Sequence, residues 1–261
     1  MFWRLGVVGS PIAHSLSPRL HEAALTSLGL EGTSEAIEIG SHDVANLKGA
    51  LSSHDALSVT MPLKEVAVAL CDELDDTARR VGGVNSLRMA NGRVLGRATD
   101  GAGLVAAVHH EFGLALEGAR VIVRGSGGSA KSIVDALVER GATVTVLARN
   151  ALEATRLAER YPSIAVNPDS SRDIDLMVNT VPAGPEDTPE TSRTKVAFAT
   201  DAAALDVVYE PRETPWLAAR RREGLRGANG LSMLVHQARE QLQWWFDREV
   251  PLEPLLMAVG Q

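Results

Sequence analysis

The stretch that decides the fold is VIVRGSGGSA, residues 121–130. Its β-branched start predicts a strand and its glycines a tight turn, and the residues that follow, up to Gly141, have apolar side chains at helical spacing. Strand, glycine-rich turn and helix in this order begin a dinucleotide-binding unit. Gly125 and Gly127 would allow the turn and the approach of a pyrophosphate, and Ala130 is the small residue needed where the helix packs on the strand.

Glycine-rich turns also occur in α/β proteins that bind no nucleotide, so the surrounding sequence has to support the interpretation. A second strand is predicted over residues 142–148, and the helix N-terminus after the glycines offers amide donors to a phosphate. We therefore expect a dinucleotide site. Its predicted contacts in the turn are Gly125, Ser126, Gly127, Gly128, Ser129 and Ala130.

The end of the second strand indicates which dinucleotide is bound. In NAD-binding units an acidic residue about 20 positions after the glycines accepts hydrogen bonds from the ribose hydroxyls. Ala148 stands in that place here, and Arg149 and Asn150 follow it. A guanidinium and an amide can hold a 2′-phosphate, which a carboxylate would repel. The sequence predicts NADP, with a solvated arginine after the strand as the alternative interpretation.

Composition bounds the remaining possibilities. The chain has 261 residues, 45% of them hydrophobic and 23% charged, which is ordinary for a soluble protein of one or two domains. A net charge of −7 argues against nucleic-acid binding and leaves no basic patch for a membrane surface. No apolar run approaches the ~20 residues of a membrane span, and residues 1–9 resemble a strand rather than a signal peptide, so we expect a cytoplasmic protein. The single cysteine, Cys71, excludes an intrachain disulfide and gives no metal cluster.

Strands alternate with helices on both sides of about residue 100, which predicts an α/β protein with two units. Asn91-Gly92 predicts a hairpin turn. Pro62 is expected to stop a strand that leads into a helix beginning near Leu63, and the residues from Ala183 to Thr194 are expected to form a surface loop. The other expected elements are strands at 4–8, 34–39, 173–179 and 204–209, and helices at 18–28, 43–51, 73–80, 101–112 and 231–247.

A few polar residues are candidates for chemistry. Lys64 falls in the first turn of its predicted helix, where the macrodipole disfavours a cation, and a broken local rule after a strand points to function. Taken alone, this lysine fits a solvated side chain as well. Asp100 precedes a helix and also fits an N-cap. Ser15 and Ser17 flank a helix N-terminus, which is suited to a carboxylate, and Ser17 also fits the cap of that helix.

Put together, these pieces resemble the shikimate dehydrogenase family, and the similarity runs through most of the chain in order. The matching stretches are GSPIAHSLSP (9–18), SVTMPLK (58–64), GGVNS (82–86), TDG (99–101), GSGGSA (125–130), ARN (148–150), VNTVPAG (178–184), DVVY (206–209), TPWL (214–217) and GLSMLVHQ (230–237). The resemblance implies a substrate-binding and catalytic domain, residues 1–100 and 237–261, and a Rossmann-type NADP-binding domain, residues 101–236. It also implies an active site in the cleft between these domains.

The resemblance further implies the NADPH-dependent, reversible reduction of 3-dehydroshikimate to shikimate, a step of chorismate and aromatic amino-acid biosynthesis. Ser15 and Ser17 would hold the substrate carboxylate, Tyr209 would lie near the junction of substrate and cofactor, and Val207 and Gly230 would contact the cofactor. The ring hydroxyls would be bound by Thr60, Lys64, Asn85, Asp100 and Gln237. Lys64 and Asp100 would carry proton transfer at the C3 oxygen, which is chemically reasonable because an ammonium can stabilise and protonate a developing alkoxide.

Some positions depart from the family pattern. Ala98 and Ser58 stand where asparagines are common, and Asn150 stands where a threonine is usual. These departures leave room for an enzyme acting on a related polyol acid, such as quinate or an aminated shikimate analogue. Two alternatives therefore stay open: an NAD-dependent quinate/shikimate dehydrogenase, and a non-catalytic metabolite sensor. The expected partners are a small-molecule substrate and NADP, in a monomer or homodimer.

Overall fold

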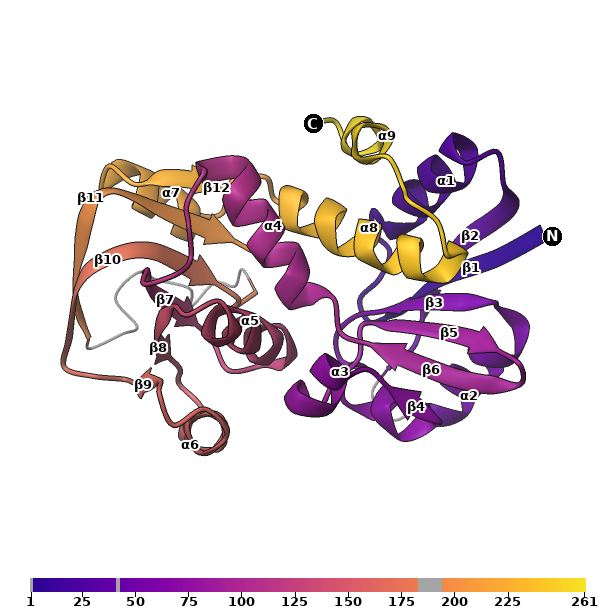
Figure 1. Ribbon diagram of the computed structural model, residues 1–261, viewed down its shortest axis with the longest axis horizontal. Helices are drawn as coiled ribbons and strands as arrows, with labels where there is room; N and C mark the ends of the chain where they lie inside the picture. The colour runs from indigo at the N-terminus through magenta and orange to yellow at the C-terminus, as the bar shows by residue number, and fades with distance from the viewer. Residues whose placement is uncertain (1, 41–42, 183–193) are drawn as a thin grey trace. The chain divides into compact units, whose positions relative to one another are not determined.

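The computed structural model describes residues 2–40, 43–182 and 194–261. The chain forms two compact units, one made of Met1–Gly103 and Leu234–Gln261, the other of Leu104–Met233. Each unit is a β-sheet with helices on both faces (Figure 1), so the predicted α/β class is confirmed. Within the described ranges, no helix is long and apolar enough to cross a membrane.

The first unit contains a mixed six-stranded sheet in the order β2-β1-β3-β5-β6-β4. Its strands are β1 Phe2–Gly9, β2 Glu31–Glu38, β3 Ala56–Val59, β4 Glu73–Leu74, β5 Ser86–Ala90 and β6 Arg93–Arg97. β1 pairs in parallel with β2 and β3, whereas β5 is antiparallel to β3 and β6. The loops after β1 and β3 therefore leave the same edge of the sheet.

Helices cover both faces of this first sheet. They are α1 Ser17–Ser27, α2 Val44–Ser53, the 3₁₀ helix η1 Val66–Leu70, α3 Asp76–Val81, α8 Leu231–Phe246 and α9 Leu252–Ala258. Figure 1 shows α1, α8 and α9 above the sheet and α2 and α3 below it. Above the sheet, the Trp3 ring packs edge-on against Phe246, with ring centroids 4.9 Å apart. This contact fixes the end of α8 on β1.

The predicted hairpin is confirmed at Asn91-Gly92, between β5 and β6. Both residues have positive φ, 52° and 74° respectively. A two-residue turn that matches the twist of the strands requires this conformation, and the Asn-Gly pair adopts it readily.

The second unit contains a six-stranded sheet in the order β12-β11-β10-β7-β8-β9, with every pairing parallel. Its strands are β7 Arg120–Arg124, β8 Thr143–Leu147, β9 Ala165–Val166, β10 Ser170–Asn179, β11 Lys195–Asp206 and β12 Arg226–Ala228. In chain order this arrangement is 3-2-1-4-5-6, the doubly wound order of dinucleotide-binding folds. The switch point lies between β7 and β10, beside the glycine-rich turn.

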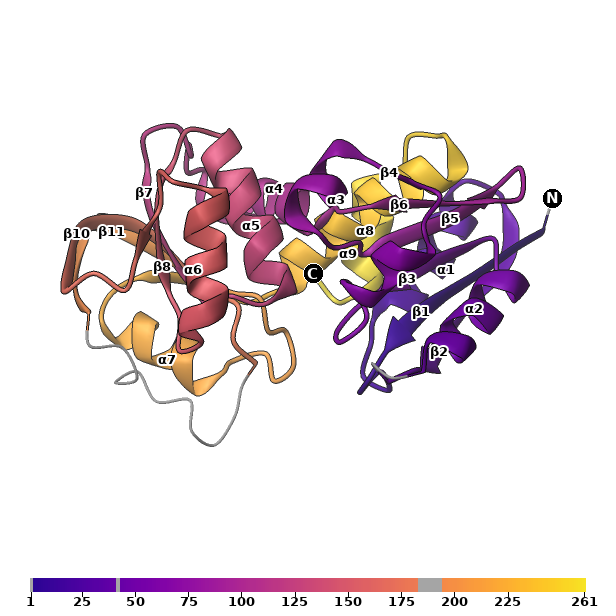
Figure 2. The same ribbon diagram turned by 90° about the horizontal axis from the view of Figure 1, so that it is seen from below.

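The helices of the second unit are α4 Asp100–Phe112, which begins in the first unit, α5 Gly128–Glu139, α6 Ala151–Arg160 and α7 Pro215–Arg222. Side chains of β7 alternate between the two faces of the sheet, as a strand requires. Val121 and Val123 pack with α4, α5 and α6, whereas Ile122 packs with Trp216 of α7. Figure 1 shows β10 and β11 between α7 and the helices α5 and α6, and Figure 2 shows the same helices from below.

Three local predictions were wrong. Glu73–Leu74 form β4, so the helix expected at 73–80 begins only at Asp76. Residues 61–65 form turns before the short η1, so Lys64 does not lie in the first turn of an α-helix, and the argument from the helix dipole does not apply. The Lys64 carbonyl accepts its hydrogen bond from Val84 N, and Val68 N donates to Glu65 O, so the hydrogen bonds of an α-helix are not formed at Lys64. Ser17 is the first residue of α1 rather than its cap, and its N–H donates to Ser15 Oγ at 3.3 Å. The loop expected from Ala183 onward lies outside the described residues, apart from Thr194.

Candidate active site

An ion pair between Lys64 and Asp100 is the centre of the first unit's polar cluster. Lys64 Nζ lies 2.5 Å from Asp100 Oδ2, and the two side chains are 15% and 4% exposed. Lys64 follows β3, and its carbonyl accepts a hydrogen bond from Val84 N, which fixes the turn that carries it. Asp100 is the first residue of α4. A charge-assisted hydrogen bond in so buried a place holds the ammonium in one position.

Asn85 joins this pair to helix α8. Its Nδ2 lies 3.0 Å from Asp100 Oδ1 and 3.1 Å from Gln237 Oε1, and its Oδ1 accepts a hydrogen bond from Thr99 N. Asn85 itself is 3% exposed. Four of the predicted site residues, Lys64, Asn85, Asp100 and Gln237, are thus brought together. The expected approach of Gln237 to Asp100 is observed, although 137 positions separate them in the chain.

Gly103 explains how α8 comes so close to α4. A Cβ at position 103 would lie 2.6 Å from Gln237 Cβ and 2.8 Å from Gln237 N, far inside contact distance. Only glycine permits this approach, because part of the obstacle is backbone. Sequence reasoning missed this role of Gly103, although its place three residues after Asp100 was a usable signal.

A second group of buried polar side chains, Gln241, Ser58 and His21, is hydrogen-bonded in a row that ends at the backbone of Asn85. Gln241, one turn after Gln237, places its Nε2 3.2 Å from Asn85 O and 3.3 Å from Thr99 Oγ1. Its Oε1 accepts a hydrogen bond from Ser58 Oγ at 2.6 Å. His21 completes the row, with Nε2 3.1 Å from Ser58 Oγ. These contacts join helices and strands distant in sequence, and no local motif predicted them.

The direction of these hydrogen bonds assigns the tautomer of His21. The Ser58 hydroxyl donates to Gln241, so Ser58 Oγ must accept from His21, whose proton is then on Nε2. The other ring nitrogen accepts from Ser34 Oγ at 2.8 Å. Burial lowers the pKa of His21 to about 3, so the ring is neutral at pH 7.

Three further predicted residues follow β1 and β3: Ser15 lies in the loop after β1, Ser17 is the first residue of α1, and Thr60 directly follows β3. Ser15 and Ser17 contact each other through the Ser17 N–H, as described above. Thr60 donates its N–H to Val8 O at 2.9 Å, and a Cβ at Gly9 would lie 2.4 Å from Thr60 Cγ2. The carboxyl ends of parallel strands are the usual edge for ligand sites, and both loops leave that edge.

In the second unit, the two key glycines of the turn have different reasons to be glycine. Gly125 has φ of +116°, and a Cβ there would lie 2.2 Å from Thr180 Oγ1, so the fold itself requires glycine. Gly127 has φ of −78°, and nothing lies within 4 Å of a Cβ at that position. Neither backbone nor packing explains Gly127, so the open space at the N-terminus of α5 fits a ligand group that approaches the backbone. Ala130 is fully buried between α5 and the sheet.

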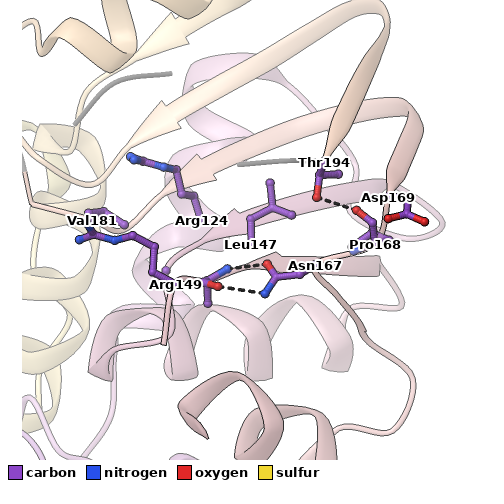
Figure 3. A pocket seen from close by; sticks show the side chains of 10 residues that line it. Arg124, Leu147, Arg149, Asn167, Pro168, Asp169, Val181 and Thr194 are labelled. Carbon is purple, nitrogen blue, oxygen red and sulfur yellow. Dashed lines mark hydrogen bonds between the residues drawn. The ribbon is translucent and has the colours of Figure 1, made fainter. Parts of the chain in front are cut away.

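A pocket of about 510 Å³ adjoins this turn, within the size range of small-molecule sites. Its lining includes Arg124, Gly125, Arg149, Asn167, Val181 and Thr194 (Figure 3). Asn167 pairs with the backbone of Ala148, accepting from its N–H at 3.0 Å and donating to its carbonyl at 2.9 Å. This pairing fixes the chain just before Arg149. A phosphate-bearing nucleotide such as NADP fits this donor set.

The remaining predicted cofactor residues take up other positions in the second unit. Asn150 is the N-cap of α6, and its Oδ1 accepts a hydrogen bond from Glu153 N at 3.2 Å. This contact occupies the side-chain oxygen of Asn150, whereas the predicted contact with a phosphate involves its side-chain N–H groups. Gly230 lies against Val207, because a Cβ at 230 would be 2.0 Å from Val207 O. Tyr209 follows on the same segment and is partly buried. Within the described ranges, no group of three or more His, Cys, Asp or Glu residues is placed to hold a metal ion.

Comparison with known proteins gives consistent matches at both ends of the chain and over its whole length. Residues 7–87 match the model of the shikimate dehydrogenase substrate binding domain, and residues 230–259 match that of the shikimate 5'-dehydrogenase C-terminal domain. A protein of Thermus thermophilus named shikimate dehydrogenase (NADP(+)) is 35% identical over 93% of this chain and 92% of its own length. A protein of the same name from Acidiphilium cryptum is 37% identical over 92% of this chain and 89% of its own length.

A solved structure shows the same similarity in three dimensions. It is the shikimate 5-dehydrogenase of Thermus thermophilus in complex with NADP(H) and shikimate. It aligns with a TM-score of 0.87 and 33% sequence identity, covering 98% of this chain and 98% of that chain.

Proposed function

The chain belongs to the shikimate dehydrogenase family, and we propose on that basis that it catalyses the reversible, NADP-linked interconversion of 3-dehydroshikimate and shikimate. The observation that carries the proposal is the buried Lys64–Asp100 pair, joined through Asn85 to Gln237. The names of the relatives confirm the prediction of an NADP-dependent oxidoreductase.

We assign the substrate to the first unit. Its carboxylate would accept hydrogen bonds from Ser15 and Ser17, which are small donors at the start of α1. Its ring hydroxyls would be held by Thr60 and by the amides of Asn85 and Gln237. Amides suit this task because each can donate and accept at the same time.

Lys64 and Asp100 would manage the proton at the reacting oxygen. In reduction, the ketone oxygen gains negative charge as hydride arrives at its carbon, and the Lys64 ammonium would stabilise that charge and donate a proton. Asp100 would hold Lys64 in position and accept a hydrogen bond from a neighbouring substrate hydroxyl. In oxidation the same groups act in reverse, with Lys64 receiving the hydroxyl proton.

We assign the nucleotide to the second unit. When bound, NADP supplies the hydride acceptor or donor. The glycine-rich turn, Gly125 to Ala130, and the N-terminus of α5 would bind the pyrophosphate, and Val207 and Gly230 would contact the nicotinamide half. Arg149 lines the pocket beside the turn and would pair with the 2′-phosphate. Ala148, in the place of a ribose-binding acid, supports NADP over NAD.

Initial-rate kinetics with shikimate and quinate, each against NADP⁺ and NAD⁺, tests the proposal. We expect turnover to be highest with shikimate and NADP⁺. Lys64→Met should lower kcat by about 10²- to 10⁴-fold, the range of general acid–base catalysis. Lys48→Met, which removes an exposed lysine from α2, is the matched control and should leave kcat unchanged. A clear preference for quinate, or for NAD⁺, would overturn the assignment of substrate or cofactor, and an unchanged kcat in Lys64→Met would overturn the proton-transfer role.

A further inference from the structure

The pocket of the second unit contains a second arginine, Arg124, which the glycine motif did not point to. Arg124 is the last residue of β7, directly before Gly125, and it lines the pocket together with Arg149. It lies two residues after Ile122, so the strand directs its side chain to the face of the sheet that α7 covers. In Figure 3 the guanidinium groups of Arg124 and Arg149 extend to the same side of the pocket, the side of Val181.

The Arg124 guanidinium is held by a rigid neighbour. Its Nη1 donates to Asn179 Oδ1 at 2.9 Å. Asn179 is 1% exposed, and its amide in turn donates to Val181 O at 3.1 Å and to Asp206 Oδ1 at 2.9 Å. Such a satisfied, buried amide has one orientation, so it fixes the position of the arginine that it supports.

Positive charge accumulates around this place. Two guanidiniums line the pocket, and among the described residues that line it the carboxylate belongs to Asp169, which is exposed to solvent. A third arginine, Arg220 of α7, is buried; its Nη2 pairs with Glu223 Oε1 at 2.5 Å, and its Nε has no hydrogen-bond partner among the described residues. Burial lowers the pKa of Arg220, Glu223 opposes this effect, and the nearby charge of Arg124 adds to it. An anion in the pocket would offset this repulsion between like charges.

We propose that Arg124 is a second specificity-determining residue for the cofactor, which acts with Arg149 to bind the phosphate monoester on the adenosine ribose of NADP. This inference deepens the proposed function and rests on the assignment of the nucleotide to this unit. A guanidinium is suited to a phosphate because its N–H groups form a planar fork that matches the phosphate oxygens. Lysine at the same position would keep the charge and lose the fork.

Calorimetric binding of two probes tests the proposal without turnover. Adenosine 2′,5′-bisphosphate carries the monoester and adenosine 5′-diphosphate lacks it. Arg124→Met should weaken binding of the 2′,5′-bisphosphate by about 10- to 100-fold, the value of a charged hydrogen bond, and change binding of the 5′-diphosphate by less than about threefold. Arg124→Lys should lie between wild type and Arg124→Met. Arg120→Met, at the opposite end of β7, is the matched control and should bind both probes like wild type.

Each contrary outcome has a definite meaning. If Arg124→Met weakens the binding of both probes equally, Arg124 serves only to hold Asn179 in place, and the proposal is refuted. Unchanged binding of the 2′,5′-bisphosphate in both Arg124 variants would overturn it as well. If Arg124→Met does not fold, Arg124→Lys provides the test. Reduced selectivity of Arg124→Lys for the 2′,5′-bisphosphate supports the proposal, and wild-type selectivity overturns it. A protein that selects the 2′,5′-bisphosphate through Arg124 but does not oxidise shikimate would retain this inference and lose the proposed function.

Discussion

Replacing Gly103 with alanine tests how the first unit positions its polar cluster. The new Cβ would lie 2.6 Å from Gln237 Cβ, where ordinary contact begins at 3.4 Å, a shortfall of about 0.8 Å. The obstacle includes Gln237 N at 2.8 Å, so a change of side-chain rotamer cannot relieve it. Helix α8 must therefore move away from α4, and Gln237 must move away from Asn85.

Two energies oppose each other in this variant. Overpacking a core costs about 1–3 kcal/mol, and replacing glycine by alanine inside a helix returns about 1 kcal/mol. The expected net loss of stability is therefore small, about 1 kcal/mol. A displacement near 1 Å at a positioning group can cost about 100-fold in rate. We therefore expect kcat/KM for shikimate to fall by about 100-fold, whereas the free energy of unfolding falls by only about 1 kcal/mol.

Urea unfolding and initial-rate kinetics on the same preparation measure both effects. Gly49→Ala is the matched control, because Gly49 lies inside α2 and nothing lies within 4 Å of a Cβ there. It should be more stable than wild type by up to about 1 kcal/mol, with unchanged kcat/KM. If Gly103→Ala keeps the wild-type kcat/KM and is as stable as Gly49→Ala, the account of α4–α8 packing is refuted.

Three further variants probe other parts of the structure. Asp100→Asn removes the partner of Lys64 and should lower kcat by about 10²-fold or more, while KM for NADP⁺ in initial-rate assays stays constant. Gly127→Ala places a methyl group in open space and should raise the Kd for NADPH in fluorescence titration, with little change in Tm. His21→Gln should flatten the pH dependence of unfolding free energy. In wild type His21 lowers this free energy by about 1.4 kcal/mol for each pH unit from pH 6.5 towards pH 3, because its ring binds a proton in the unfolded chain and stays neutral in the folded protein.

The outcomes that contradict these predictions are equally specific. Wild-type kcat in Asp100→Asn would remove Asp100 from the reaction, and a large drop in the Tm of Gly127→Ala would mean that the fold, not a ligand, requires that glycine. For His21, the quantity to compare is the slope of unfolding free energy against pH in wild type and in His21→Gln, and this comparison does not depend on the stability of the variant at neutral pH. Parallel pH profiles for wild type and His21→Gln would show that the buried ring is not the group that titrates.

The second unit could be predicted well from sequence because its signals are local. The β-branched run before Gly125 and the small Ala130 specify strand, turn and helix within ten residues, and the parallel sheet follows from that pattern. The hairpin at Asn91-Gly92 was predictable for the same reason, since two adjacent residues supply both positive φ angles.

Contacts between distant segments could not be predicted in this way. Gln241 reaches Ser58 across 183 positions, and the role of Gly103 depends on a helix that follows it by more than 120 residues. The helix predicted at Lys64 was wrong because the Lys64 carbonyl accepts a hydrogen bond from Val84 N, a residue 20 positions later, which local sequence does not reveal. Arg124 was missed because its partner, Asn179, ends a different strand.

The most direct test of the central claim measures products in one reaction. Purified protein is mixed with shikimate and NADP⁺, and both reduced nicotinamide and 3-dehydroshikimate are quantified over time, with the Lys64→Met variant in parallel. The account predicts that the two products form in equal amounts at a rate that depends on Lys64. Absence of both products, in a protein that still binds NADP⁺, would contradict it.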